Sequence, residues 1–367
     1  MKNTLRIGAI GAVSALALTA CSSAPADETA ATSAATSGAP ETTAVETIDY
    51  KACMVSDEGG FDDGSFNQSG FEGLQRAAAD LGISQATAES NGEDQYAPNI
   101  EAMVAADCDL ILTVGFALSS ATVEAALANP DVAFAIVDDL ADNDFNGETD
   151  APNIKPLTFQ TDEAAFLAGY AASSASTSGT IATFGGMAFP SVTIFMDGFL
   201  AGANAYNADT DASVAVLGWD GTDGAFTGDF SDLAKGQTTA QGFIDQGADI
   251  ILPVAGPVGG GAAAAAQTAG NTWIVGVDAD WTVTFPEYSD IIFTSILKNI
   301  GTAVFDTISE AISDTGVSFT PYVGTLDNGG VGLAPFAEGT VSADVEAKLQ
   351  ELTDGIIAGT ITPNTAG

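Results

Sequence analysis

The chain has 367 residues, of which 46% are hydrophobic, so it can fill the cores of two ordinary domains. It carries 49 acidic and 8 basic side chains, no histidine and a formal net charge of −41. A surface with this charge repels phosphate backbones and anionic headgroups, which excludes nucleic acid as a partner. The absence of histidine from the sequence also argues against an activated cysteine nucleophile.

The first residues have the pattern of a lipoprotein signal. Lys2 and Arg6 form a basic region, residues 7–18 are apolar, and Leu-Thr-Ala-Cys at 18–21 places small residues before Cys21. This pattern predicts a signal peptide over 1–20 and a lipid on Cys21, which anchors the protein to the cell membrane facing outside the cytoplasm. A signal-anchor helix is the alternative, but the apolar run is short for a bilayer. Residues 21–47 are rich in Ala, Ser and Thr without aromatic residues, which predicts a disordered tether.

From residue 50 onward, short apolar runs alternate with amphipathic stretches. This alternation predicts an α/β fold with parallel sheets covered by helices on both faces, repeated at least twice, so that two lobes face each other across a cleft. The expected strands are 52–56, 110–114, 134–137, 180–184, 213–217, 250–254, 273–277 and 291–295. The expected helices include 66–81, 97–105, 119–128, 163–175, 191–205, 232–246 and 297–315.

Two cysteines lie in the body of the chain. Cys53 and Cys108 each stand at the start of an expected strand, and those strands should be parallel neighbours. Outside the cytoplasm this placement permits a disulfide, whereas two reduced buried thiols are the alternative.

The loop after the first expected strand carries groups suited to a ligand. Asp57 stands at the strand end, paired glycines follow, and Ser65, Phe66 and Asn67 place an aromatic ring beside an amide at a helix start. The alternative is a turn with an N-cap serine and a core phenylalanine.

Further candidates follow other strands. Asp138-Asp139 and Asp278-Ala-Asp280 supply carboxylates that accept hydrogen bonds from paired hydroxyls, which favours a sugar-bearing ligand over isolated helix caps. The glycine run from Gly256 to Gly261 lacks the phosphate-loop pattern, so we expect a loop whose amides contact an uncharged ligand. Lys298 is expected either to neutralise these aspartates or to stand at a solvated helix start.

The segment from Asp142 to Asn153 has nearly the oxygen spacing of a calcium loop. It departs at the last position, where Asn153 replaces a bidentate glutamate, and a strand rather than a helix precedes it. An acidic surface loop without metal is therefore our expectation.

The motifs taken together resemble the basic membrane protein family, the lipoprotein substrate-binding components of ABC importers that include purine nucleoside receptors. The resemblance covers nearly all of the chain after residue 48. Its motifs are Asp57 to Gly73, Tyr96-Ala-Pro-Asn-Ile, Asp109 to Phe116, Phe134 to Asp138, Ala165 to Tyr170, Gly185 to Pro190, Val254-Ala-Gly and Val275-Gly-Val-Asp.

The resemblance implies a type I periplasmic-binding-protein fold, two doubly wound lobes joined by three crossovers. It places 48–157 and about 281–315 in the first lobe, and about 158–280 and 316–367 in the second. The lobes would close over a ligand, and the importer's permease subunits would recognise this closed form. No cofactor, metal or catalysis is implied.

The resemblance also implies roles for individual residues. Phe66 and Phe230 match two phenylalanines that sandwich the base, although Phe226 or Trp219 could take the second place. Asp57 and Asn67 match residues at the base edge. The positions that match ribose-binding residues are Asp138, Gly256, Asp278 and Lys298.

Other functions remain open at this point. The same fold could bind another solute, such as a sugar or an autoinducer-like molecule. A nucleoside hydrolase is a weaker alternative, because such enzymes usually need a histidine or carboxylates clustered in one loop. A purely adhesive surface protein would show no stabilisation by ligands.

Overall fold

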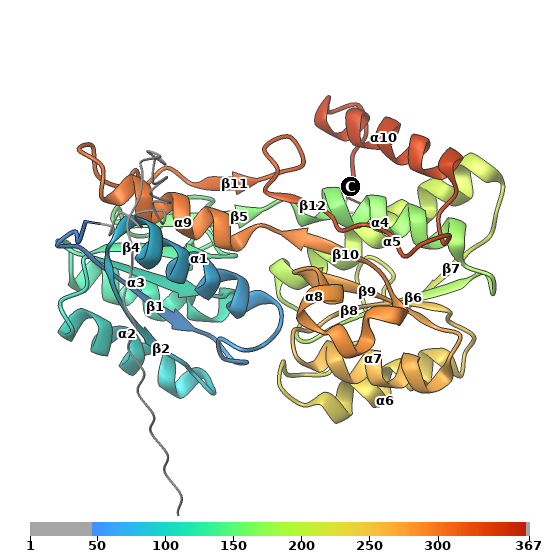
Figure 1. Cartoon of the computed structure of the whole chain (residues 1–367), viewed down its shortest axis with the longest axis horizontal. Coiled ribbons are helices and arrows are strands. Elements are labelled where there is room, and N and C mark those ends of the chain that lie inside the picture. The colour runs from blue at the N-terminus through green and yellow to red at the C-terminus, as the bar shows by residue number, and fades with distance from the viewer. Residues whose placement is uncertain (1–45, 365–367) are drawn as a thin grey trace, which may run out of the picture. The chain divides into compact units, whose positions relative to one another are not determined.

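The computed structural model describes residues 46–364 of the protein. Over these residues the chain forms two lobes, each built around a six-stranded sheet with helices packed on it (Figure 1). The predicted signal peptide, Cys21 and all but the last two residues of the predicted tether lie outside the described residues. Within residues 46–364, no helix combines the length and the apolar character needed to cross a membrane.

The first lobe is organised by a sheet whose neighbouring strands are all parallel. In spatial order its strands are β11 (Tyr322–Gly324), β5 (Ile154–Phe159), β4 (Ala133–Val137), β3 (Leu110–Val114), β1 (Lys51–Ser56) and β2 (Ser84–Ala88). The central strands are apolar without alternation because both faces of the sheet are covered. In β1, Ala52 and Met54 face one core, whereas Cys53 and Val55 face the other.

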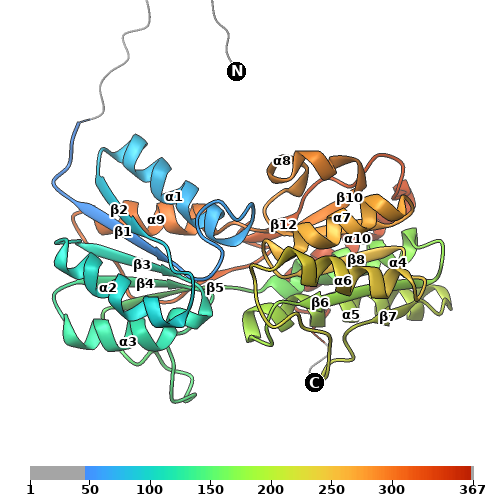
Figure 2. The same cartoon turned by 90° about the horizontal axis from the view of Figure 1, so that it is seen from below.

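The helices of the first lobe lie in two layers. α1 (Phe66–Leu81) packs beside α9 (Ile300–Ala311), and α2 (Tyr96–Ala105) packs beside α3 (Ser119–Ala128) on the other face (Figure 2). Short 3-10 turns, η1 (Glu93–Gln95) and η2 (Phe116–Leu118), precede α2 and α3.

The second lobe repeats this plan, apart from one antiparallel edge strand, β12. In spatial order its strands are β12 (Val331–Leu333), β10 (Ile292–Lys298), β9 (Trp273–Asp278), β8 (Ile250–Val254), β6 (Thr180–Gly185) and β7 (Ala215–Leu217). The helices are α4 (Thr161–Ala175), α5 (Pro190–Thr210), α6 (Leu233–Ile244), α7 (Val258–Ala269), α8 (Trp281–Thr284), η3 (Pro286–Ile291) and α10 (Ala343–Ile357). α4 pairs with α5 and α6 with α7, while α10 lies on α4.

The chain passes between the sheets three times, after β5, after β10 and after β11, which confirms the predicted fold class. The predicted lobe boundary near 281 differs from the structure. Strand β10 pairs with β9, so the segment that returns to the first lobe begins only after Lys298, and β11 extends the return beyond residue 315. The apolar run 291–297 does not itself indicate which sheet it joins, and this pairing decides it.

Cys53 and Cys108 form a disulfide in the structure, with their Cα atoms 6.0 Å apart. Cys53 lies within β1, and Cys108 lies two residues before the start of β3, the parallel neighbour of β1. The bridge therefore joins β1 to the segment that leads into β3, away from the loop that carries Asp57 and follows the other end of β1.

Candidate ligand-binding site

A pocket lies between the two lobes, and all eight residues predicted to contact a ligand line it. Those residues are Asp57, Phe66, Asn67, Asp138, Phe230, Gly256, Asp278 and Lys298. They come from the loops or helix starts that follow strands of both sheets, together with Asp278 and Lys298, the last residues of β9 and β10. Because parallel strands of a sheet end at one edge, residues far apart in sequence meet here.

The loop between β1 and α1 is held by Asp63. Its carboxylate accepts hydrogen bonds from the backbone amides of Ser65, Asn67 and Gln68 at 2.9, 2.9 and 3.0 Å. Asp63 thus satisfies the helix N-terminus, and the alternative interpretation is wrong in this respect, because Ser65 stands at the N-cap position but its side chain does not cap the helix. The Ser65 hydroxyl instead donates across to the second lobe, to Val277 O at 3.1 Å or Asp278 Oδ2 at 2.8 Å.

Asp57 and Asn67 form one polar wall of the pocket. Asn67 Nδ2 donates to Asp57 Oδ1 at 2.8 Å, while the buried Asn67 Oδ1 has no hydrogen-bond partner among the described residues. Burial raises the pKa of Asp57 well above its usual value, with Asp63, Asp138 and Glu58 adding to the effect and the Asn67 bond opposing it. This wall therefore offers a free acceptor, and Asp57 favours the protonated form compared with an ordinary aspartate.

Lys298 lies between the aspartates at the ends of β4 and β9. Its Nζ is 2.6 Å from Asp138 Oδ2 and 3.5 Å from Asp278 Oδ1, and its side chain is 2% exposed. It is therefore the last residue of a strand rather than a solvated helix start. Asp138 and Asp278 both adopt a left-handed backbone with φ of 67°, which aspartate tolerates better than most residues. Asp278 Oδ1 is buried and makes no hydrogen bond within residues 46–364.

Charge and burial act in opposite directions on these groups. Burial raises the pKa of Asp138, and the neighbouring Lys298 only partly offsets this effect. Burial lowers the pKa of Lys298, but Asp138 and Asp278 outweigh it, so that the lysine pKa is raised overall. Lys298 therefore stays charged and stabilises anionic partners at the base of the pocket.

Aromatic rings line the pocket from both lobes. Phe66, the first residue of α1, has Lys298 Nζ 5.0 Å from its ring centroid. On the second lobe, the ring of Phe230 lies 6.0 Å from that of Phe189, which lies 5.1 Å from Phe116 of the first lobe. Gly186 permits this arrangement, because a Cβ there would lie 2.3 Å from the Phe230 ring.

The two alternatives for the second aromatic position do not line this pocket. Trp219 is 7% exposed, and its indole donates to Asp197 Oδ1 at 2.8 Å. Phe226 packs edge-on against Trp219 and contacts Gly185. Phe230 is therefore the candidate that the fold brings to the pocket.

Several lining residues were not assigned to the site from the sequence. They are Glu58, Asp63, Gly115, Phe116, Phe189, Ser191, Val192, Phe195, Val254, Ala255, Pro257 and Val277. A signal existed for Phe116 and Phe189, because both stand within the motifs that carry the family resemblance. Phe195 lies inside α5, where an apolar residue is indistinguishable from core by pattern alone.

The acidic segment from residue 142 to 153 contributes no residue to the lining of the pocket. Carboxylate oxygens of Asp142, Asp144 and Asp150 lie within 4.8 Å of one another. Asn153 does not join these carboxylates as a further ligand. Its amide nitrogen donates to the carbonyls of Ala126, Asn129 and Val132. Asp142 accepts the backbone amides of Asn146 and Gly147, and we assign no metal to this loop.

Comparison with known proteins agrees with this architecture. The family model described as "ABC transporter substrate-binding protein PnrA-like" matches residues 50–365. The chain is 31% identical over 98% of its length to the "ABC transporter nucleoside-binding protein BmpA" of Lactococcus lactis, 98% of which is covered. It is 33% identical over 69% of its length to "Basic membrane protein A" of Borreliella burgdorferi, with 70% of that protein covered.

Solved structures support the fold. An ABC transporter solute-binding protein from Aeropyrum pernix superposes with a TM-score of 0.75 at 24% identity, covering 85% of this chain and 92% of that one. The matched family consists of transporter binding proteins and not of enzymes, as expected from the sequence. The chain therefore belongs to the PnrA-like, or basic membrane protein, family of ABC transporter substrate-binding proteins.

Proposed function

We propose that this protein captures nucleosides, with a preference for purines, and delivers them to the permease subunits of an ABC importer. The observation that carries the proposal is a pair of buried acceptor atoms in one pocket, Asn67 Oδ1 and Asp278 Oδ1, which accept no hydrogen bond among the described residues; Asp278 Oδ1 has only the ion pair with Lys298 Nζ at 3.5 Å. Buried acceptors are normally satisfied, so both favour a ligand with hydrogen-bond donors at two places. The Lactococcus relative is described as a nucleoside-binding protein, which agrees with this assignment.

The base would lie between Phe66 and Phe230. Both rings line the pocket, and a purine presents two polarisable faces on which aromatic side chains stack. At the base edge, Asn67 Oδ1 would accept from a ring or exocyclic N–H. Asp57, with its raised pKa, would add a carboxyl group that accepts as an anion or donates when protonated.

The ribose would lie at the opposite end of the pocket. Asp138 and Asp278 would accept hydrogen bonds from the sugar hydroxyls, and Lys298 Nζ would donate to a sugar oxygen. Gly256, with φ of 51° and no side chain, lets the backbone between β8 and α7 approach the sugar. A flat heterocycle can stack on two aromatic rings at once, which favours a nucleoside over a plain sugar.

The proposal also includes attachment of the protein to the cell membrane. Substrate-binding proteins of ABC transporters work outside the cytoplasm, and we infer that a lipid on Cys21 anchors this one to the membrane. Metabolic labelling with an alkyne fatty acid should mark the wild-type protein and leave Cys21→Ser unlabelled. Release of the unlabelled variant into the medium would accompany that result, whereas a labelled variant would contradict the anchor.

A thermal-shift panel of purine nucleosides, pyrimidine nucleosides, free bases and sugars tests the ligand. A nucleoside at 100 times its Kd should stabilise the protein by about 2.7 kcal/mol. Phe66→Ala should weaken binding by about 5- to 150-fold, the effect of about 1–3 kcal/mol for one stacked base. Equal stabilisation of the wild type and Phe66→Ala would refute the stacking assignment.

Two further readouts separate the alternatives. Free base released from inosine by the purified protein would indicate a hydrolase, against which the family membership argues. Stabilisation by sugars alone would identify a sugar receptor of the same fold. Absence of any shift across the panel would remove the nucleoside proposal.

A further inference from the structure

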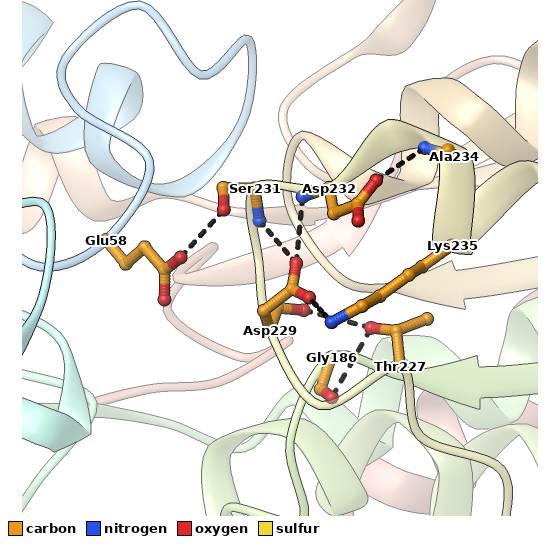
Figure 3. A network of polar contacts seen from close by, with 8 residues as sticks. All are labelled: Glu58, Gly186, Thr227, Asp229, Ser231, Asp232, Ala234 and Lys235. Atoms are coloured by element: carbon orange, nitrogen blue, oxygen red, sulfur yellow. Dashed lines mark hydrogen bonds and ion pairs between the residues drawn. The ribbon is translucent and has the colours of Figure 1, made fainter.

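The loop that carries Phe230 is fixed by Asp229. The Asp229 carboxylate accepts the backbone amides of Ser231 and Asp232 at 3.0 and 2.8 Å and pairs with Lys235 at the start of α6 (Figure 3). Thr227 Oγ1 donates to the backbone oxygen of Asp229 at 2.9 Å. These contacts make a compact turn, so that Phe230 and Ser231 are held in one fixed relation.

The two residues after Asp229 point to different partners. Phe230 lines the ligand pocket, whereas the Ser231 hydroxyl donates to Glu58 Oε1 of the first lobe at 2.7 Å. Figure 3 shows Glu58 reaching this hydroxyl from a separate segment, the loop between β1 and α1. Glu58 itself lines the pocket, so the bond joins the two lobes at a pocket-lining residue.

Charge adds to this contact. The bond to Asp229 raises the pKa of Lys235, and Asp232 and Glu58 contribute through their charges. Glu58 of one lobe is therefore drawn towards a cation of the other, within a surface that is otherwise strongly acidic. Opening of the lobes would separate Glu58 from both Ser231 and Lys235.

We propose that Glu58 and Ser231 form a closure latch, positioned by the Asp229 turn, that sets the rate at which a bound ligand leaves the pocket. This inference rests on the proposed nucleoside function for its ligand. A base stacked on Phe230 holds the adjacent Ser231 in place for Glu58. Ligand stacking and lobe closure are thus joined through two consecutive residues.

The dissociation rate of 2-aminopurine riboside, a fluorescent nucleoside, measures the latch by stopped flow. Ser231→Ala and Glu58→Ala should each raise the dissociation rate by about 2- to 12-fold, the effect of one ordinary hydrogen bond. The double variant should dissociate little faster than either single variant, because both remove the same contact. Glu124→Ala changes an exposed glutamate on α3 of the first lobe and should leave the rate unchanged.

Glu58→Gln separates the hydrogen bond from the charge. The amide oxygen can still accept from Ser231, so a rate near that of the wild type assigns the latch to the hydrogen bond. A rate near that of Glu58→Ala assigns the latch to attraction by Lys235, provided that the difference in rate between this variant and the wild type becomes smaller at high salt. Additive effects of the two alanine changes, or changes below twofold, would refute the latch.

A measurement without ligand separates failure of the latch from failure of the proposed function. Small-angle X-ray scattering should give a larger radius of gyration for ligand-free Ser231→Ala than for the wild type, because the open form becomes more populated. If the wild type binds no nucleoside, the proposed function fails, and this comparison alone decides the latch. Identical radii together with unchanged dissociation rates would refute it.

Discussion

Replacing Lys298 by an uncharged residue should lower the free energy of unfolding more than the same change at any other lysine. Nζ lies 2.6 Å from Asp138 Oδ2 and 3.5 Å from Asp278 Oδ1, and the lysine and aspartate side chains are 2% and 7% exposed. In Lys298→Met the methionine side chain takes the place of the apolar part of the lysine, but two buried carboxylates lose their counter-ion. Breaking a buried pair in this way typically costs about 3–5 kcal/mol.

The chain offers a matched control for this change. Lys348 also contacts two carboxylates, Asp209 at 3.2 Å and Glu351 at 3.5 Å, but its side chain is 30% exposed. Lys348→Met should cost no more than about 1 kcal/mol, because exposed ion pairs contribute little. Urea unfolding of the two variants at pH 7.5 makes the comparison.

The stability cost of Lys298→Met should also depend on pH, in a direction that follows from the pKa of Asp138. Without Lys298, the pKa of Asp138 should rise further in the folded protein, because only burial and neighbouring acids remain. A carboxyl whose folded pKa exceeds its unfolded pKa destabilises the fold as pH rises through that window. The loss in Lys298→Met should therefore be smaller at pH 5 than at pH 7.5. Equal costs for the Lys298 and Lys348 variants, or a cost that grows on acidification, would refute the reasoning.

Three further changes test other parts of the structure. Gly186→Ala places a Cβ 2.3 Å from the Phe230 ring, so nucleoside affinity measured by calorimetry should fall as in Phe230→Ala; wild-type affinity would contradict this packing. Asp57→Asn should gain stability relative to the wild type as pH rises above about 4, because the folded pKa of Asp57 is raised; parallel urea-midpoint curves would count against that assignment. Replacing Cys53 and Cys108 by alanine opens a crosslink that spans 55 positions and should cost up to about 4 kcal/mol; an unchanged midpoint would argue against a constrained unfolded chain.

The sequence alone was sufficient for the fold class and for the expectation that the candidate residues lie together, whereas their contact with a ligand stays a prediction. Apolar runs separated by helical stretches require parallel strands, and parallel strands of one sheet end at one edge. The polar residues after those strands therefore had to meet, whichever lobe each belonged to. The motif from Asp57 to Asn67 then identified the family, because its residues occur together with matches along the rest of the chain.

Tertiary structure decided what depends on pairing and on the contact between lobes. Residues 291–297 are apolar in either sheet, and only the pairing of β10 with β9 makes Lys298 a buried strand end beside Asp278. Glu58 and Ser231 are ordinary polar residues in sequence, separated by 173 positions, and their hydrogen bond exists only because the two lobes meet. The local sequence pattern indicates whether a segment prefers helix or strand and whether it is buried. Strand pairing and contacts between lobes depend instead on how whole segments and lobes are placed, which the local pattern does not indicate.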